Sequence, residues 1–133
     1  SRTSLRVCLI DDDVFVLEAL ALGLRDCGYE VRTATGAAAG FDLILHGGID
    51  AVVTDLNMPG AGGAELIAEV RARWLHLPII AISGGRENER GDITDSARVL
   101  GADMMLIKPF RARELDEALQ RAMGARRTSH RAR

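Results

Sequence analysis

The chain has 133 residues, of which 47% are hydrophobic and 27% are charged, and its formal net charge is −2. This is the size and composition of one globular domain with a buried core, and no apolar run approaches the roughly 20 residues that a membrane span requires. We therefore expect a soluble cytoplasmic domain without a membrane partner. Cys8 and Cys27 fall in a predicted strand and a predicted helix, where we expect two buried thiols rather than a disulfide.

Short apolar runs alternate with longer amphipathic segments along the chain. The short runs predict strands, and the segments with apolar residues every three or four positions predict helices. The predicted strands are 7–10, 29–34, 50–55, 78–83 and 104–107. Three of the predicted helices are 37–46, 64–73 and 111–123. A further helix, after the first strand, carries Leu17, Leu20, Ala21 and Leu24 and stops at Gly28, and another, after the fourth strand, carries Ile93, Ala97 and Leu100.

Five strand–helix units in succession predict an α/β fold. Because each crossover must be right-handed and long enough to return, the expected architecture is a doubly wound, five-stranded parallel sheet with helices on both faces. Continuous apolar runs, which are typical of central strands, occupy 7–10, 50–55 and 78–83, whereas 29–34 alternates as an edge strand does.

One domain accounts for most of the chain. We assign residues 1–124 to it, and 125–133 to a basic tail or the start of a linker. The tail sequence "ARRTSHRAR" contains four arginines and no acid. Arginines without a recognition motif do not indicate a nucleic-acid site, so we expect no direct binding of nucleic acid by this domain.

Polar residues stand where several of these strands end. Three consecutive aspartates, Asp11 to Asp13, follow the first strand, Asp55 ends the third, Ser83 ends the fourth and Lys108 follows the fifth. In an open α/β sheet, ligands bind beyond the carboxyl ends of the strands, where the strand order reverses. We expect these residues to form one site.

Adjacent carboxylates repel one another, and at about 4 Å with an effective dielectric of 20 each pair costs on the order of 4 kcal/mol. A hard divalent cation offsets that repulsion, and Mg²⁺ prefers one or two carboxylates together with other oxygens and waters. Mg²⁺ beside a carboxylate, a hydroxyl and a lysine is an arrangement for phosphoryl transfer. The sequence has no glycine-rich phosphate-binding loop of the Walker type, so bound ATP is not implied.

The segments "LIDDD", "VVTDLNMPG", "AISG" and "GADMMLIKPF" occur in this order at the predicted strand ends. Through them the chain resembles the receiver domain of two-component response regulators, over about residues 5–123. The resemblance implies the CheY-like (flavodoxin-like) fold with strand order 2-1-3-4-5. It also implies a phosphorylation-driven switch that accepts a phosphoryl group from a sensor histidine kinase or a phosphotransfer protein and signals to a downstream output. Such a domain is no enzyme beyond self-catalysed phosphotransfer and autodephosphorylation.

The resemblance assigns a role to each acidic position. Asp55 matches the phosphoacceptor, which becomes an acyl phosphate and is also a ligand of Mg²⁺. Asp12 would ligate the metal directly and Asp11 largely through a bound water. The backbone carbonyl of Asn57 would be a further metal ligand.

The other two strand ends match the family as well, with two departures. Ser83 matches the hydroxyl position that swings toward the phosphoryl group, and Lys108 matches the invariant lysine, whose bond to Pro109 is usually cis in this family. Met105 stands where many receivers have Tyr or Phe, so an output route through a rotating aromatic is not expected. The segment between Ser83 and Gly101 is longer than in compact members and is predicted to contain a mobile loop.

Two other functions fit parts of the same pattern. "IDDDVF" also fits the D-x-D-x-[TV] motif of haloacid dehalogenase-type phosphatases, with Asp11 as nucleophile and Asp13 as acid, although the chain lacks a cap insertion and a second acidic pair after the lysine. A pseudo-receiver would use the fold only as a binding platform, and the complete set of site residues argues against it. Helix capping alone needs one aspartate, a role that suits Asp13.

Overall fold

The computed structural model describes residues 4–58, 62–84 and 101–131, with the side chains of the last helix only as far as Gly124. The helix predicted around Ile93 lies outside the described residues. So does most of the segment between Ser83 and Gly101 that is predicted to contain a mobile loop.

The described strands form one parallel sheet of five strands in the order β2-β1-β3-β4-β5, which confirms the predicted fold class and strand order. The strands are β1 (Arg6–Ile10), β2 (Glu30–Ala34), β3 (Ala51–Asp55), β4 (Ile79–Ser83) and β5 (Met104–Ile107). Every residue of β3 and β4 is buried, whereas β2, at one edge, has exposed residues. The apolar patterns therefore predicted correctly which strands are central and that 29–34 is an edge strand.

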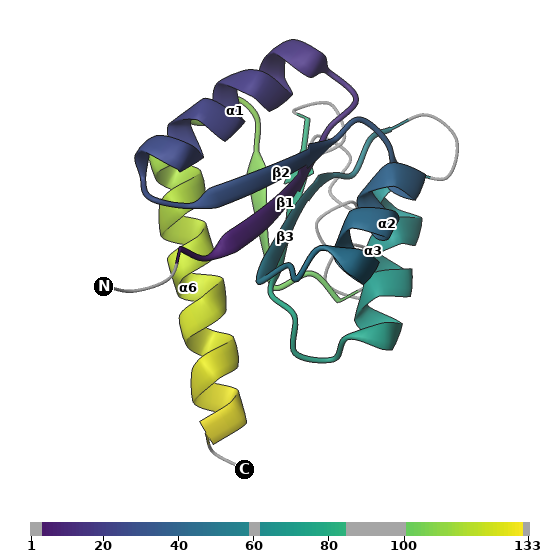
Figure 1. Cartoon of the computed structure of the whole chain (residues 1–133), viewed down its shortest axis with the longest axis vertical. Coiled ribbons are helices and arrows are strands. Elements are labelled where there is room, and N and C mark those ends of the chain that lie inside the picture. The colour runs from purple at the N-terminus through teal and green to yellow at the C-terminus, as the bar shows by residue number, and fades with distance from the viewer. Residues whose placement is uncertain (1–3, 59–61, 85–100, 132–133) are drawn as a thin grey trace.

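Helices cover both faces of this sheet. The described helices are α1 (Val14–Asp26), α2 (Ala37–His46), α3 (Gly63–Arg73) and α6 (Ala112–Arg131). Helices α1 and α6 lie on one face, and α2 and α3 lie on the other (Figure 1). None of the helices in the described ranges is both long and apolar enough to cross a membrane.

Helix α6 is longer than predicted. The apolar periodicity that locates this helix in the sequence ends at Met123, the last of its described side chains that packs in the core. The backbone continues as helix to Arg131, because each residue added to a helix that has already formed adds a backbone hydrogen bond. The segment assigned to a tail from residue 125 therefore begins as helix.

Alternate residues of the central strands face opposite helical layers, so the sheet separates two hydrophobic cores. In β1, Val7 and Leu9 pack with α1 and α6, whereas Cys8 and Ile10 pack with α2 and α3. The central strands are thus held from both sides. This packing fixes the positions of the carboxyl ends of the central strands.

The start and the end of α1 follow the sequence signals. The Asp13 carboxylate accepts hydrogen bonds from the N–H groups of Phe15 (3.0 Å) and Val16 (3.3 Å), which confirms Asp13 as the helix N-cap. Gly28 has a φ of 100°, in the left-handed region that favours glycine. Asp13 therefore has a structural role, separate from that of its two acidic neighbours.

The two cysteines differ from each other. Cys8 is buried in β1, and burial raises the pKa of its thiol to about 12. The prediction that Cys27 is buried as well is wrong, because this residue is exposed. It is the C-cap of α1 and lies beyond Leu24, the last residue of the helix that packs in the core.

Replacing Leu119 by Ala should lower the free energy of unfolding by about 2–5 kcal/mol, because Leu119 is fully buried and its loss leaves a cavity. The matched control is Phe15→Ala. Phe15 is 88% exposed on α1, so its removal should change stability by less than about 0.5 kcal/mol. Urea unfolding followed by circular dichroism measures both, and equal effects would contradict the assignment of the core.

Candidate functional site

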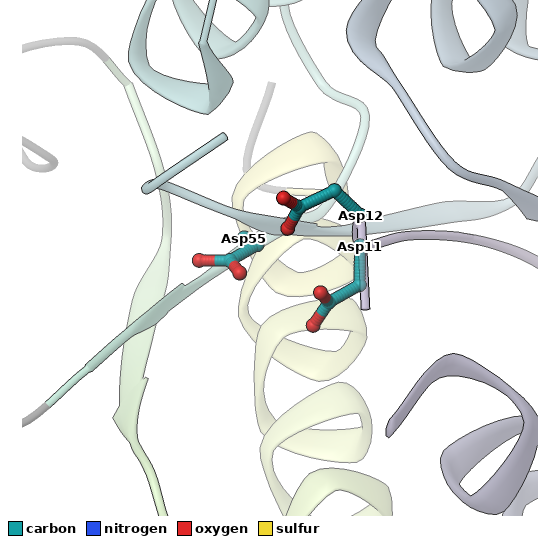
Figure 2. A group of neighbouring side chains, drawn as sticks. All are labelled: Asp11, Asp12 and Asp55. Atoms are coloured by element: carbon teal, nitrogen blue, oxygen red, sulfur yellow. The ribbon is translucent and has the colours of Figure 1, made fainter. Parts of the chain in front are cut away.

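Three aspartates come together at the carboxyl end of the sheet, where β1 and β3 lie side by side. Ile10 and Thr54 are register partners in these strands, so the residues that follow them, Asp11 and Asp55, are neighbours. Asp11 and Asp55 are buried, and Asp12 is exposed. One carboxylate oxygen of each aspartate lies within 4.8 Å of the others, and Figure 2 shows the three carboxylates grouped at the strand ends.

Lys108 reaches two of these carboxylates from the end of β5. Its backbone N–H donates to the Ser83 carbonyl oxygen over 2.9 Å, and its peptide bond to Pro109 is cis, as the resemblance implies. The ammonium Nζ lies 3.2 Å from Asp55 Oδ2 and 3.3 Å from Asp11 Oδ2. One cation thus bridges two buried carboxylates.

Burial and charge oppose each other at this ion pair. Burial raises the pKa of Asp55 above its ordinary value of 3.8, and the charge of Asp11 raises it further, while the Asn57 N–H and the Lys108 ammonium lower it in part. At Lys108, burial lowers the pKa, but the carboxylates of Asp55 and Asp11 raise it by more, so the net pKa is above 10.5. Lys108 is therefore a charged ammonium, and its charge together with the Asn57 N–H does not fully offset the effect of burial on the ionised form of Asp55.

The donor set suits a divalent metal ion. Among the described residues of the site, three carboxylates surround one ammonium, so negative charge is in excess. Asp11 Oδ2 is buried and accepts no hydrogen bond from the described residues; its close polar neighbour is the ammonium of Lys108. Carboxylate oxygens of this kind are the ligands of hard cations such as Mg²⁺, Ca²⁺ or Mn²⁺.

Asn57 and Ser83 lie next to the cluster in different ways. The Asn57 N–H donates to Asp55 Oδ1 over 3.0 Å and so orients the carboxylate; that its carbonyl binds metal stays a prediction. Ser83 is fully buried at the end of β4, beside β3, where Asp55 pairs with Ile82. Its hydroxyl donates to the Gly84 carbonyl oxygen over 3.0 Å. A swing toward a phosphoryl group requires it to break that bond.

Two residues next to Asp55 are not among the predicted site residues. The buried Thr54 hydroxyl donates to the Asp55 carbonyl oxygen over 3.1 Å, and Gly63, the first residue of α3, lies directly against the same carbonyl. In the sequence, Thr54 reads as part of a buried strand and Gly63 as one of three glycines in "PGAGG". No sequence signal distinguishes either of them.

The strand order, the helices on both faces and the acidic cluster with its lysine define a CheY-like α/β domain. The chain belongs to the response regulator receiver domain family, whose sequence model matches residues 7–120. Domains of this family act as phosphorylation-driven switches in two-component signalling. That is the class of function to which this chain belongs.

Known relatives support the same assignment. The chain is 37% identical over 132 residues to the transcriptional regulatory protein PrrA of Mycobacterium tuberculosis, covering 96% of this chain and 54% of that protein. It is 37% identical over 123 residues to the transcriptional regulatory protein FixJ of Azorhizobium caulinodans, covering 91% of this chain and 56% of that protein. The chain thus spans about half the length of these relatives.

Solved structures match over the whole length of single receivers. The chemotaxis response regulator CheY4 of Vibrio cholerae superposes with a TM-score of 0.80 at 28% identity, covering 90% of this chain and 99% of that one. The crystal structure of a protein from Chloroflexus aurantiacus gives a TM-score of 0.83 at 30% identity, covering 92% of this chain and 99% of that one. The described residues therefore have the fold of a receiver domain.

Met105 departs from the pattern that the resemblance leads one to expect. It lies in β5 and is half-buried against the core of α2 and α3. A rotating aromatic ring is thus absent from this position, as the sequence indicates. Any output route through β5 depends on repacking of a flexible thioether side chain instead.

Replacing Asp55 by Asn should raise the free energy of unfolding at neutral pH in metal-free buffer. Because the folded-state pKa of Asp55 lies above 3.8, the stability linked to this group is fully present below pH 3.8 and is lost as pH rises through the folded-state pKa. Asn carries no charge and avoids that loss. Urea unfolding of both proteins as a function of pH measures the difference, which should grow with pH and then level off. A difference independent of pH would contradict the raised pKa.

Proposed function

We propose that Asp55 is the phosphoacceptor of this receiver and that its phosphoryl group comes from a sensor histidine kinase or a phosphotransfer protein. The observation that carries the proposal is the geometry around Asp55. Asp55 is 4% exposed at the end of β3, with the Lys108 ammonium 3.2 Å from its Oδ2 and two further aspartates beside it. Family membership supplies the class of reaction.

In the transfer, a carboxylate oxygen of Asp55 attacks the phosphorus of a phosphohistidine. The O–P bond forms as the P–N bond breaks, and the imidazole nitrogen keeps the electron pair of that bond and takes up a proton. The product is an acyl phosphate. Attack of water on its phosphorus returns the carboxylate and releases inorganic phosphate. These self-catalysed steps make the chain a signalling domain rather than an enzyme with a separate substrate.

Mg²⁺ would be held by the carboxylates of Asp11, Asp12 and Asp55 and by the backbone carbonyl of Asn57. When bound, the ion supplies positive charge to the oxygens of the transferred phosphoryl group. Lys108 acts through its own ammonium, which already contacts Asp55 and Asp11 and can exchange a carboxylate partner for a phosphoryl oxygen. The excess of negative charge among the described site residues supports the choice of a divalent ion.

The switch follows from the new charge at Asp55. A phosphoryl group adds strong acceptor oxygens, and the proposed side-chain donors to them are Ser83, at the end of the neighbouring strand β4, and Lys108, which follows β5. The Ser83 hydroxyl leaves the Gly84 carbonyl, to which it donates now, and binds a phosphoryl oxygen. The loops that follow β4 and β5 are biased by these new contacts.

The receiver transmits its state to an output domain or protein. The relatives PrrA and FixJ are named transcriptional regulatory proteins, and this chain covers 54% and 56% of their lengths. By analogy, residues 1–124 form the receiver and 125–133 lead toward the output. The receiver itself binds neither nucleic acid nor a membrane, and its kinase partnership implies a cytoplasmic location.

Incubation with acetyl phosphate and Mg²⁺ should add one phosphoryl group to Asp55, mapped by mass spectrometry after borohydride trapping. Asp55→Asn should abolish the label. The matched control is Asp13→Asn, which makes the same change of charge at an exposed position and keeps a good helix cap; it should be labelled like the wild type. Label on Asp11, with turnover of added phosphomonoesters, would instead support a haloacid dehalogenase-type phosphatase.

Removal of the divalent ion should stop this labelling. EDTA should abolish it and Mg²⁺ should restore it, and Asp12→Asn should weaken Mg²⁺ affinity about tenfold or more, because the site loses a ligand. Isothermal titration calorimetry measures the affinity. A wild-type chain that binds no cation and takes no label would be a pseudo-receiver, used only as a binding platform.

A further inference from the structure

The backbone carbonyl of Asp55 is in contact with the first residue of α3. A Cβ built on Gly63 would lie 1.8 Å from the Asp55 carbonyl oxygen, 2.7 Å from its carbonyl carbon and 2.9 Å from Leu56 Cα. All three are backbone atoms, so no side chain can turn away to make room. Only glycine allows α3 to start at this distance from the end of β3.

The same carbonyl is also held by a buried hydroxyl. Thr54 Oγ1 donates to the Asp55 carbonyl oxygen over 3.1 Å, and Thr54 is fully buried. The peptide that follows Asp55 is therefore restrained by a directional hydrogen bond as well as by the start of α3. Either restraint limits how this peptide can rotate.

Helix α3 has little freedom to move away. Leu66, Ile67 and Val70 are at most 2% exposed and pack in the core on the α2 and α3 face of the sheet. Interiors of this density do not accept an added methyl group without displacement of neighbouring atoms. A side chain at position 63 would therefore act mainly on the Asp55–Leu56 peptide.

Displacement of that peptide would change the site directly. The Asp55–Leu56 peptide lies between Asp55 and Asn57 in the chain, and the Asn57 N–H donates to Asp55 Oδ1 over 3.0 Å. In the proposed function the carbonyl of Asn57 is also a metal ligand. The orientation of the nucleophile and the position of that ligand both depend on the same short segment.

We propose that Gly63 and Thr54 are positioning residues for phosphorylation: together they hold the Asp55 carbonyl, and through it the Asp55–Asn57 turn, in the geometry that the reaction needs. The inference rests on Asp55 being the phosphoacceptor. Neither residue touches the reacting atoms. Both act through the backbone of Asp55.

The first test is Gly63→Ala. The rate of Asp55 phosphorylation by acetyl phosphate at saturating Mg²⁺ should fall about tenfold or more, because small displacements of a reacting group have effects of this size. In the metal-free protein, the amide proton of Asn57 should shift upfield in the NMR spectrum as its bond to Asp55 Oδ1 weakens. A merely structural role would not move that resonance.

Two glycine variants serve as matched controls. Gly62→Ala places a methyl group in the same loop, 3.2 Å from the Met58 carbonyl oxygen, with a φ of −79° that alanine adopts readily. Gly23→Ala creates a severe overlap elsewhere, 2.4 Å from Ala112 Cβ between α1 and α6. Gly62→Ala should keep the wild-type rate and Asn57 resonance. Gly23→Ala should lower Tm and keep both.

Variants of Thr54 decide the inference if Gly63→Ala does not fold. Thr54→Val removes the hydroxyl at nearly constant shape and should lower the rate and shift the Asn57 amide, and Thr54→Ser should restore both. The inference is overturned if folded Gly63→Ala matches Gly62→Ala, or if Thr54→Val matches the wild type. Absence of label on Asp55 in the wild type would overturn the proposed function instead, while the Asn57 resonance would still report on the positioning.

Discussion

The contact of one ammonium with two buried carboxylates is the interaction on which the site depends. Lys108 Nζ lies 3.2 Å from Asp55 and 3.3 Å from Asp11, both of which are nearly or fully buried. A buried ion pair contributes little net stability, because removing its charges from water offsets most of their attraction. With Asp12 also present, the cluster is short of positive charge. That shortage is the physical reason for a divalent cation in the proposed function.

Packing far from the charges holds this cluster together. Because the strands are parallel, the carboxyl ends of β1, β3 and β5 lie at one edge, and Asp11 and Lys108, which are far apart in the sequence, become neighbours. The two cores hold the central strands from both faces. Helix α3 adds a direct link, since Gly63 at its start lies against the Asp55 carbonyl. The geometry of the nucleophile is thus coupled to the core of α2 and α3.

Elements with a strong local signal were predicted well. The strands with continuous apolar runs, the edge strand and the Asp13 cap are set by periodicity and by short-range hydrogen bonds, which depend on neighbouring residues alone. The exposure of Cys27 and the continuation of α6 to Arg131 were not predicted. An apolar pattern indicates which residues pack in the core, and it does not indicate at which residue a helix ends. Gly63 carried no signal because its importance lies in contact with a carbonyl on another element, and Thr54 carried none because an apolar pattern does not show which hydrogen bond a buried hydroxyl makes.

The order of apolar and polar residues is sufficient to specify a doubly wound parallel sheet and to put acids, a hydroxyl and a lysine at the strand ends, because strand direction alone sends those residues to one edge. It does not specify distances between groups on different strands. That Lys108 bridges Asp11 and Asp55, and that α3 begins against the Asp55 carbonyl, follow only when the helices pack on the sheet. Such separations are set by the volumes of all the side chains between the layers.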